Sequence, residues 1–348
     1  MKILFLVTNF NFVGGKERYD KDLIRALQEG GVGLRVVRLS GRALPRKILF
    51  VLRACVSAVF FKPDVLFASH VSFSSVICAV NRFTGIPYVV CTAGTEVWDI
   101  KKESIKKALR NARLILYISD YTKEKMTRQM EELRKKMFFL PPSVREKLFT
   151  IRKKPESPYK TLLTVARLRP NEEEKGYLKV IDALPGLRKE FSNIRYIIVG
   201  AVLREFGDNT ERIRAYARER GAAECVIVVG EVSDRELADY YNLCDVFVMP
   251  STQEGFGIVF LEALASGKPV IAGNKDGSKD ALLGGKLGIL VDPDNVEEIA
   301  AAIVKVLKKQ APPEILDGNL LRKEMIEVYG VDKFKKRVIE LVHELETT

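Results

Sequence analysis

The sequence has 348 residues, of which 47% are hydrophobic and 29% are charged, and this composition fits a soluble globular protein of two domains. No apolar run approaches the roughly eighteen residues of a membrane-spanning helix. Two histidines, and five cysteines without a CxxC pair, disfavour a zinc site and a disulfide framework. The apolar start is too short for a signal peptide and lacks a cleavage pattern, so we expect a cytoplasmic protein with reduced cysteines.

The net charge of +12 is concentrated in the first half of the chain. Residues 1–154 contain 30 Lys and Arg against 13 Asp and Glu, whereas the remainder contains 27 against 32. A basic half suggests an anionic partner, such as a membrane surface or a phosphorylated acceptor. Nucleic acid is not expected, because no recognisable module with interleaved aromatic residues accompanies the charge. The alternative is a solvated, charged surface from a thermophile, a source that also suits the four glutamines.

The chain opens with a strand–turn–helix–strand unit. We expect a strand over 2–8, a turn containing Gly14 and Gly15, a helix over 16–29 and a strand over 32–39. This order predicts a parallel, doubly wound sheet with helices on its faces.

The next segment, residues 42–63, mixes Arg and Lys with Leu, Ile, Val and Phe over the length of one helix. A basic amphipathic helix of this kind can lie on an anionic membrane surface. The alternative interpretation is a helix that packs on the core and turns a charged face outward.

Alternating strands and helices continue through the first half. We expect strands over 64–68, 88–91 and 114–118, and helices over 72–83, 101–112 and 120–136. The polar segment 152–158 contains two prolines and is the expected linker. The first domain, residues 1–154, would therefore be a Rossmann-like domain.

The second half repeats the alternation. We expect strands over 161–166, 196–199, 225–229, 245–249, 270–272 and 288–291, with helices over 176–190, 209–220 and 233–243. Asp294, with Glu297 three residues later, predicts a capping box for a helix that runs to about 308. Residues 155–330 would form a second Rossmann-like domain. A last helix, within 331–348, is long enough to return to the first domain.

The most informative stretch is 254–262, which follows the strand over 245–249. Gly255 and Gly257 allow a tight turn and a close approach to a ligand. The helix that follows presents free N–H groups and its positive dipole end to that turn, which is an anion site. Glu254 and Glu262 flank the turn. Since carboxylates repel phosphate, we expect them to bind hydroxyls, and a nucleotide-sugar satisfies both requirements.

A second group of residues follows the strand over 161–166. Arg167 comes directly after this strand, and Lys175 comes eight residues later, where a helix begins. Two cations at strand ends would neutralise a diphosphate and stabilise the charge that develops on a leaving phosphate. The alternative is surface ion pairing with the three glutamates at 172–174.

The stretch 254–262 resembles the E-x7-E signature of retaining GT-B glycosyltransferases, most closely glycosyltransferase family 4 (glycosyl transferases group 1). The resemblance extends to the strand before it and to the Ala-Ser-Gly-Lys-Pro-Val run at 265–270. Arg167 and Lys175 are similar to that family's donor-phosphate cations. The turns at Gly14–Glu17, Gly94–Trp98 and Leu140–Ser143 resemble further family segments, so the likeness spans nearly the whole chain.

This resemblance implies a GT-B fold, in which two doubly wound Rossmann-like domains face each other across a cleft, and a reaction that retains the anomeric configuration without a metal or other cofactor. It implies that Glu254 contacts the donor sugar, Glu262 the ribose, and Arg167 and Lys175 the diphosphate. The resemblance also implies that the backbone of Gly255, Phe256, Gly257, Ile258 and Val259 holds the sugar and phosphate. Gly15 would let the chain approach the donor phosphate or the acceptor. The nucleobase would lie near Gly230, Glu231 and Val232. The acceptor candidates are Gly14, His70 and Glu96.

The sequence departs from the family pattern at two places. Ala93 stands where the family usually has a histidine, and any contact made by that imidazole is absent or supplied by another group such as His70. The family's short glycine loop after Gly200 is replaced by a longer segment, 201–207. Asp292 and Asp294 spell the DxD signature of a different glycosyltransferase fold, but their position before a helix favours capping.

The expected function is transfer of a sugar from a UDP- or GDP-linked donor to a hydroxyl acceptor, which would be a sugar, a glycolipid or a lipid carrier. The protein would be cytoplasmic, with a peripheral membrane location as the alternative. Two other functions remain open: a nucleotide-sugar-binding scaffold without turnover, and a GT-B isomerase acting on the nucleotide-sugar itself. The sugar, the base and the acceptor depend on loop side chains that the pattern does not place.

Overall fold

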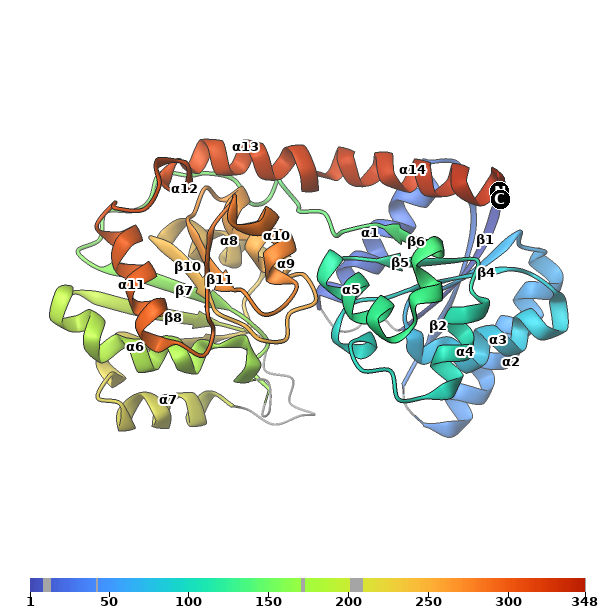
Figure 1. Cartoon of the computed structure of the whole chain (residues 1–348), viewed down its shortest axis with the longest axis horizontal. Coiled ribbons are helices and arrows are strands. Elements are labelled where there is room, and N and C mark those ends of the chain that lie inside the picture. The colour runs from blue at the N-terminus through green and yellow to red at the C-terminus, as the bar shows by residue number, and fades with distance from the viewer. Residues whose placement is uncertain (9–13, 42, 170–172, 201–208, 348) are drawn as a thin grey trace. The chain divides into compact units, whose positions relative to one another are not determined.

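The computed structural model describes residues 1–8, 14–41, 43–169, 173–200 and 209–347 (Figure 1). The chain forms two compact units. One contains Met1–Ser143 together with Asp332–Thr348, and the other contains Val144–Val331. The helix after residue 331 thus belongs with the first unit.

The first unit is built on a six-stranded parallel sheet. Its strands are β1 (Lys2–Thr8), β2 (Gly33–Leu39), β3 (Val65–Ala68), β4 (Tyr88–Cys91), β5 (Leu114–Tyr117) and β6 (Met137–Phe139). The order is β2-β1-β3-β4-β5-β6, with every neighbouring pair parallel. Its helices are α1 (Gly15–Glu29), α2 (Leu44–Phe61), α3 (Ser74–Thr84), α4 (Glu103–Asn111), α5 (Asp120–Gln129) and α14 (Val331–Thr347). From β1 the chain adds β2 on one side of the sheet and β3 to β6 on the other, so the strand order reverses between β1 and β3.

The second unit repeats this plan. Its strands are β7 (Lys160–Val165), β8 (Ile194–Val199), β9 (Val226–Gly230), β10 (Val246–Met249), β11 (Val270–Gly273) and β12 (Ile289–Val291). The order is β12-β11-β10-β7-β8-β9, again with parallel neighbours. Its helices are α6 (Tyr177–Glu190), α7 (Thr210–Glu219), α8 (Asp234–Leu243), α9 (Ile258–Ala265), α10 (Ser278–Ala281), α11 (Val296–Leu307), α12 (Pro313–Leu316) and α13 (Gly318–Tyr329). Here the order reverses between β7 and β10.

The units divide earlier than the boundary expected after residue 154, because the segment from Val144 packs on the second unit. The Val144 N–H donates to the Tyr329 carbonyl oxygen at 3.2 Å. The Phe149 ring lies 5.6 Å from the Tyr241 ring, in an edge-to-face arrangement. These contacts attach the segment before the proline-rich stretch to α8 and α13.

Two local expectations were wrong. The single helix expected over 120–136 is α5 followed by a separate 3₁₀ turn, Glu131–Lys136. The break falls at Met130, whose backbone leaves the helical region to bury its side chain in the core. At α11 the capping residue is Asn295, whose side chain accepts the Glu298 N–H at 3.0 Å, and not Asp294.

Candidate active site

The predicted donor residues of the second unit gather where its strand order reverses. Arg167 and Lys175 lie in the connection that follows β7, and Glu254 lies in the connection that follows β10. Since β7 and β10 are parallel neighbours, their carboxyl ends meet at one edge of the sheet. This edge, at a reversal of strand order, is where doubly wound sheets bind their ligands.

The buried Lys175 and the partly buried Glu254 form an ion pair across these two connections. The Lys175 Nζ donates to Glu254 Oε2 at 2.9 Å and to the Gln253 carbonyl oxygen at 3.3 Å. The Lys175 side chain is only 8% exposed. Burial by itself lowers the pKa of Lys175, and the nearby Arg167 lowers it too, but the Glu254 carboxylate and its hydrogen bond leave the pKa raised. Lys175 is therefore a fixed ammonium cation.

This arrangement contradicts the alternative in which Lys175 pairs with neighbouring surface glutamates. Of those, Glu173 pairs with Arg212 instead. The Thr252 N–H donates to the Glu174 carbonyl oxygen at 2.9 Å, so the backbone joins the two connections as well. Glu172 lies outside the described residues.

The turn before α9 has the backbone shape that the glycines predict. Gly257 adopts φ +91° and precedes the helix without a side-chain cap. The Phe260 N–H donates to the Gly257 carbonyl oxygen at 3.0 Å, which leaves the N–H groups of Ile258 and Val259 for another acceptor at the positive end of the helix. The Phe256 side chain points into the core, with its ring 5.2 Å from that of Tyr329. Any contact from Phe256 to a ligand would therefore use its backbone.

Glu262 lies in the second turn of α9, and its side chain is buried. The Tyr241 hydroxyl donates to Glu262 Oε2 at 2.9 Å and lies 3.2 Å from the Val259 carbonyl oxygen. Tyr241 therefore holds the carboxylate against the start of α9. Val232, expected beside the nucleobase, follows β9 at the same edge of the sheet, whereas the segment 201–207 lies outside the described residues.

Asp276, in the connection after β11, was missed by sequence reasoning. Its Oδ2 accepts the Ser251 hydroxyl at 2.7 Å and the Glu254 N–H at 2.8 Å, and its Oδ1 accepts the Ser278 N–H at 2.9 Å. The Gly277 N–H also donates to the Glu254 carbonyl oxygen at 2.8 Å. The buried Asp276 carboxylate and the Gly277 N–H therefore hold the N–H and the carbonyl group of Glu254, respectively. The only signal for this role was a polar run at the end of an apolar strand.

We expect Asp276→Asn to destabilise the second unit by about 1–3 kcal/mol, because the new amide group would face a backbone N–H donor. Burial raises the pKa of Asp276 to about 6 despite its hydrogen bonds. Between pH 4 and 6 the native state then binds more protons than the unfolded state, so this group makes the native protein less stable as pH rises. The unfolding free energy that Asp276→Asn loses relative to the native protein should therefore be largest near pH 4. This loss should shrink towards pH 7, by up to about 3 kcal/mol.

This change in deficit is measured as the difference in unfolding free energy between native protein and variant from pH 4 to pH 7. A difference in unfolding free energy that does not depend on pH would contradict a raised pKa for the buried Asp276 carboxyl group. The comparison is made against the native protein because Asp20, in the first unit, also has its pKa raised to about 6 by burial.

The acceptor candidates of the first unit also gather where its strand order reverses. Gly14 and Gly15 open α1 after β1, and His70 follows β3. The Lys16 Nζ joins the two connections, since it contacts Asp20 Oδ2 at 2.6 Å and donates to the Ser69 hydroxyl at 3.1 Å. Each unit thus places its predicted residues at its own reversal point.

His70 lies beside the turn in which Ala93 replaces the family histidine. Its Nε2 is 4.0 Å from Glu96 Oε1, and the same carboxylate oxygen accepts the Ala93 N–H at 2.5 Å. The His70 Nδ1 accepts the Ser72 N–H at 3.1 Å, so His70 also caps a 3₁₀ turn. Burial lowers the pKa of His70, although Glu96 acts in the opposite direction. The lowered pKa favours the neutral ring near pH 7.

A family model described as Glycosyl transferases group 1 matches residues 144–327, which is more than half of the chain. The chain belongs to this family. The matched segment lies within the second unit and contains Arg167, Lys175, Glu254 and Glu262.

Relatives of this group 1 glycosyl transferase include a curated protein of Mycobacterium tuberculosis, named GDP-mannose-dependent alpha-(1-6)-phosphatidylinositol monomannoside mannosyltransferase. The two are 36% identical over 154 residues, which is 42% of this chain and 38% of the relative. The chain thus matches about four-tenths of that relative's length.

Two solved structures resemble nearly the whole chain. They are sucrose-phosphate synthase from Thermosynechococcus elongatus, with TM-score 0.81, 20% identity and 99% of each chain covered, and Anabaena HepE in complex with UDP and glucose, with TM-score 0.79, 19% identity and 99% and 100% covered. At such identities the likeness concerns the fold. It confirms the expected α/β GT-B fold with two doubly wound parallel sheets.

In this group 1 glycosyl transferase, one lysine side chain forms ion pairs with both aspartates of the DxD sequence. The Lys275 Nζ lies 2.6 Å from Asp292 Oδ1 and 2.7 Å from Asp294 Oδ2. Asp292 Oδ1 also accepts the Asp294 N–H, so the pair shapes the turn before α11. Over the residues that the structure describes, no group of three or more His, Cys, Asp or Glu side chains could hold a metal ion.

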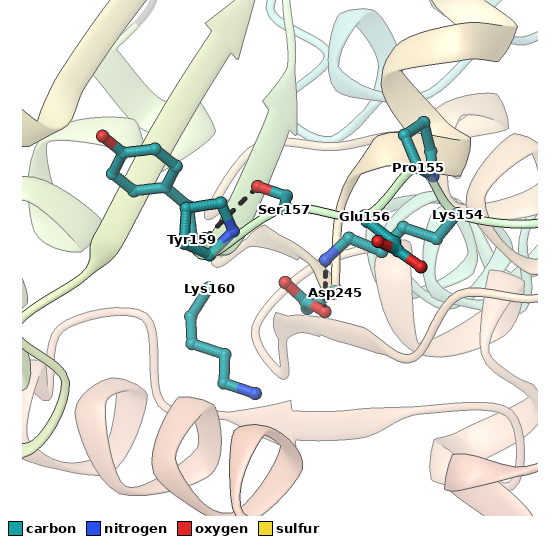
Figure 2. Close-up of a pocket in the computed structure, with 8 residues that line it drawn as sticks. Lys154, Pro155, Glu156, Ser157, Tyr159, Lys160 and Asp245 are labelled. Atoms are coloured by element: carbon teal, nitrogen blue, oxygen red, sulfur yellow. Dashed lines mark hydrogen bonds and ion pairs between the residues drawn. The ribbon is translucent and has the colours of Figure 1, made fainter.

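A pocket of about 340 Å³ in the second unit lies at the opposite edge of its sheet (Figure 2). It is lined by residues 154–160, which lead into β7, and by Asp245, which precedes β10. The Lys154 Nζ lies 2.6 Å from Asp245 Oδ1 across it. Because strands begin at this edge, the pocket is separate from the carboxyl ends that carry Arg167 and Glu254.

Proposed function

We propose that this protein transfers a hexosyl group from a UDP- or GDP-linked sugar to a hydroxyl of an acceptor, as a retaining enzyme of glycosyltransferase family 4. The observation that carries the proposal is the grouping of Arg167, the fixed Lys175 cation and the uncapped start of α9 around Glu254, at one reversal of strand order. Together these groups offer cations and N–H donors to a diphosphate, and a carboxylate to sugar hydroxyls.

The chemistry needs little more than these groups. The bond between the anomeric carbon and the β-phosphate oxygen breaks, and the acceptor oxygen bonds to that carbon on the same face. The acceptor proton passes to the leaving phosphate. Arg167 and Lys175 stabilise the charge that builds up on this phosphate, which is the role a metal ion would otherwise fill. Glu254 orients the sugar, and Glu262, held by Tyr241, binds the ribose.

The acceptor binds at the reversal point of the first unit, around Gly14, His70 and Glu96, with Gly15 close to either the donor phosphate or the acceptor. The name of the Mycobacterium tuberculosis relative includes a phosphatidylinositol glycolipid, which supports a lipid-linked acceptor. Such an acceptor favours a peripheral location on the cytoplasmic face of a membrane.

A thermal-shift panel of UDP- and GDP-sugars tests the donor. A ligand at about 100 times its dissociation constant stabilises the folded protein by about 2.7 kcal/mol, which should raise the midpoint of a unit this size by roughly 5–10 °C. The nucleotide-sugar with the largest shift is then incubated without acceptor. Slow release of free sugar supports a transferase. Binding without any release would indicate a scaffold, and a rearranged nucleotide-sugar would indicate an isomerase.

A further inference from the structure

Helix α2 packs on the first unit through a narrow stripe of residues. Phe50, Ala54 and Ala58, spaced four apart, are its buried residues, and two of the three are small. In Figure 1 the helix lies beside α3, in the blue part of the chain. A residue two positions away from this stripe points to the opposite side of the helix. Most of the surface of α2 therefore faces outward.

The outward face of α2 is apolar. Ile48, Leu52, Val56 and Val59 recur at helical spacing on the side opposite the buried stripe, and Leu44, Leu49 and Phe60 extend it. Leu52 is 57% exposed and Phe60 is 79% exposed. By contrast, the described part of α14, in the same unit, exposes a single large hydrophobic residue, Ile339. The helix thus packs on the core as the alternative interpretation expected, but its outward surface is mainly apolar, with the cations beside the apolar side chains.

The charged residues of α2 all have one sign. Leu44–Phe61 contains Arg46, Lys47 and Arg53 and no Asp or Glu, and Lys62 follows it. All four cations are exposed, and within the described residues none of them forms an ion pair. An apolar face edged by unneutralised cations repels a second copy of itself and attracts a surface that combines apolar and anionic groups.

We propose that the outward face of α2 docks the protein on the surface of an anionic lipid bilayer. The apolar side chains would enter the boundary between headgroups and acyl chains, and the cations would contact lipid phosphates. The three cations within α2 favour a helix that lies in the surface. In the described residues, no helix meets the length and hydropathy needed to cross a membrane.

Flotation of the full-length protein with lipid vesicles, in the absence of donor, tests the proposal. Vesicles of mixed phosphatidylglycerol and phosphatidylcholine should carry the protein, and pure phosphatidylcholine vesicles should carry far less. Binding should weaken at high salt because exposed charges are screened. The result is independent of sugar transfer, so failure of the proposed function would not change it.

Two double variants separate the apolar and the charged contributions. Leu52→Ser/Val56→Ser and Arg46→Glu/Arg53→Glu should each reduce vesicle binding at least about tenfold. All four side chains are exposed, so the thermal midpoint should change little. The matched control is Ile227→Ser/Ile339→Ser, which also removes two exposed apolar side chains but lies away from α2. It should float like the native protein.

Three outcomes would overturn the proposal. These are native protein that stays with neither type of vesicle, variants that float as well as the control, and self-association that is abolished by Leu52→Ser/Val56→Ser. The last outcome, measured by analytical ultracentrifugation without lipid, would assign the face to contact between copies of the chain.

Discussion

Replacement of Glu254 by Gln is expected to lower the transfer rate at least about a hundredfold, because the carboxylate that orients the donor sugar is lost. The fold should survive, since the amide oxygen of Gln can still accept a hydrogen bond from Lys175. Initial rates with the donor identified by thermal shift measure the first effect, and the unfolding midpoint measures the second. Glu219→Gln, on the surface of α7 in the same unit, is the control and should change neither.

Glu254→Ala separates positioning of the substrate from stabilisation of Lys175. This variant should also lose transfer, but it leaves the buried Lys175 ammonium with the Gln253 carbonyl oxygen, 3.3 Å away, in place of its ion-pair partner. Removal of one partner from a buried ion pair costs about 3 kcal/mol or more, so Glu254→Ala should be clearly less stable than Glu254→Gln.

Arg167→Ala, at an exposed position, should abolish transfer with little loss of stability. Full activity of either Glu254→Ala or Arg167→Ala would refute the site.

Gly257→Ala should destabilise the second unit by about 3 kcal/mol and remove nucleotide binding. The backbone at Gly257 has φ +91°, where a side chain adds roughly 1–2 kcal/mol of strain. An added Cβ would also overlap the ring of Phe260, which is fully buried and packs against Phe247. Crowding of this kind typically costs another 1–3 kcal/mol. The midpoint of unfolding should fall by roughly 6–12 °C, and titration with UDP and GDP measures binding.

Gly186→Ala is the matched control for this glycine. Gly186 lies inside α6, and a Cβ at that position would meet nothing within 4 Å. Alanine is the better helix former by about 0.8–1.0 kcal/mol, so this variant should be as stable as the native protein or slightly more so. A Gly257→Ala protein that resembles Gly186→Ala in stability and nucleotide binding would show that the turn before α9 does not need its left-handed backbone.

Much of the fold was predictable because the spacing of apolar residues, and the glycines and prolines that end helices and strands, are local features of the sequence. The buried strands read as short apolar runs, and glycine turns separated them from the helices that follow. Where a local signal competed with tertiary packing, the prediction failed. Met130 ends α5 early because its side chain packs in the core, and Asn295 takes the cap of α11 while Lys275 holds Asp292 and Asp294. The segment after Val144 looked like part of the first half, since its contacts with α8 and α13 come from distant parts of the chain.

The candidate site divides in the same way. Glu254, Gly257 and Glu262 lie within one loop and one helix, so their spacing carried their prediction. The Lys175–Glu254 pair joins residues 79 positions apart, and only the parallel pairing of β7 with β10 brings them within 2.9 Å. Asp276 had no signal of comparable strength, because its role consists of hydrogen bonds to the backbone and hydroxyls of other loops.

The sequence by itself determined the two doubly wound sheets and the glycine turn at 254–262, because both depend on residue order and short spacings. The tertiary structure decided three further properties. It paired Lys175 with Glu254, it placed Asp276 beneath their loop, and it left the apolar side of α2 uncovered. The physical reason is the same in each case: burial, ion pairing and exposure depend on which distant residues become neighbours, and folding alone settles that.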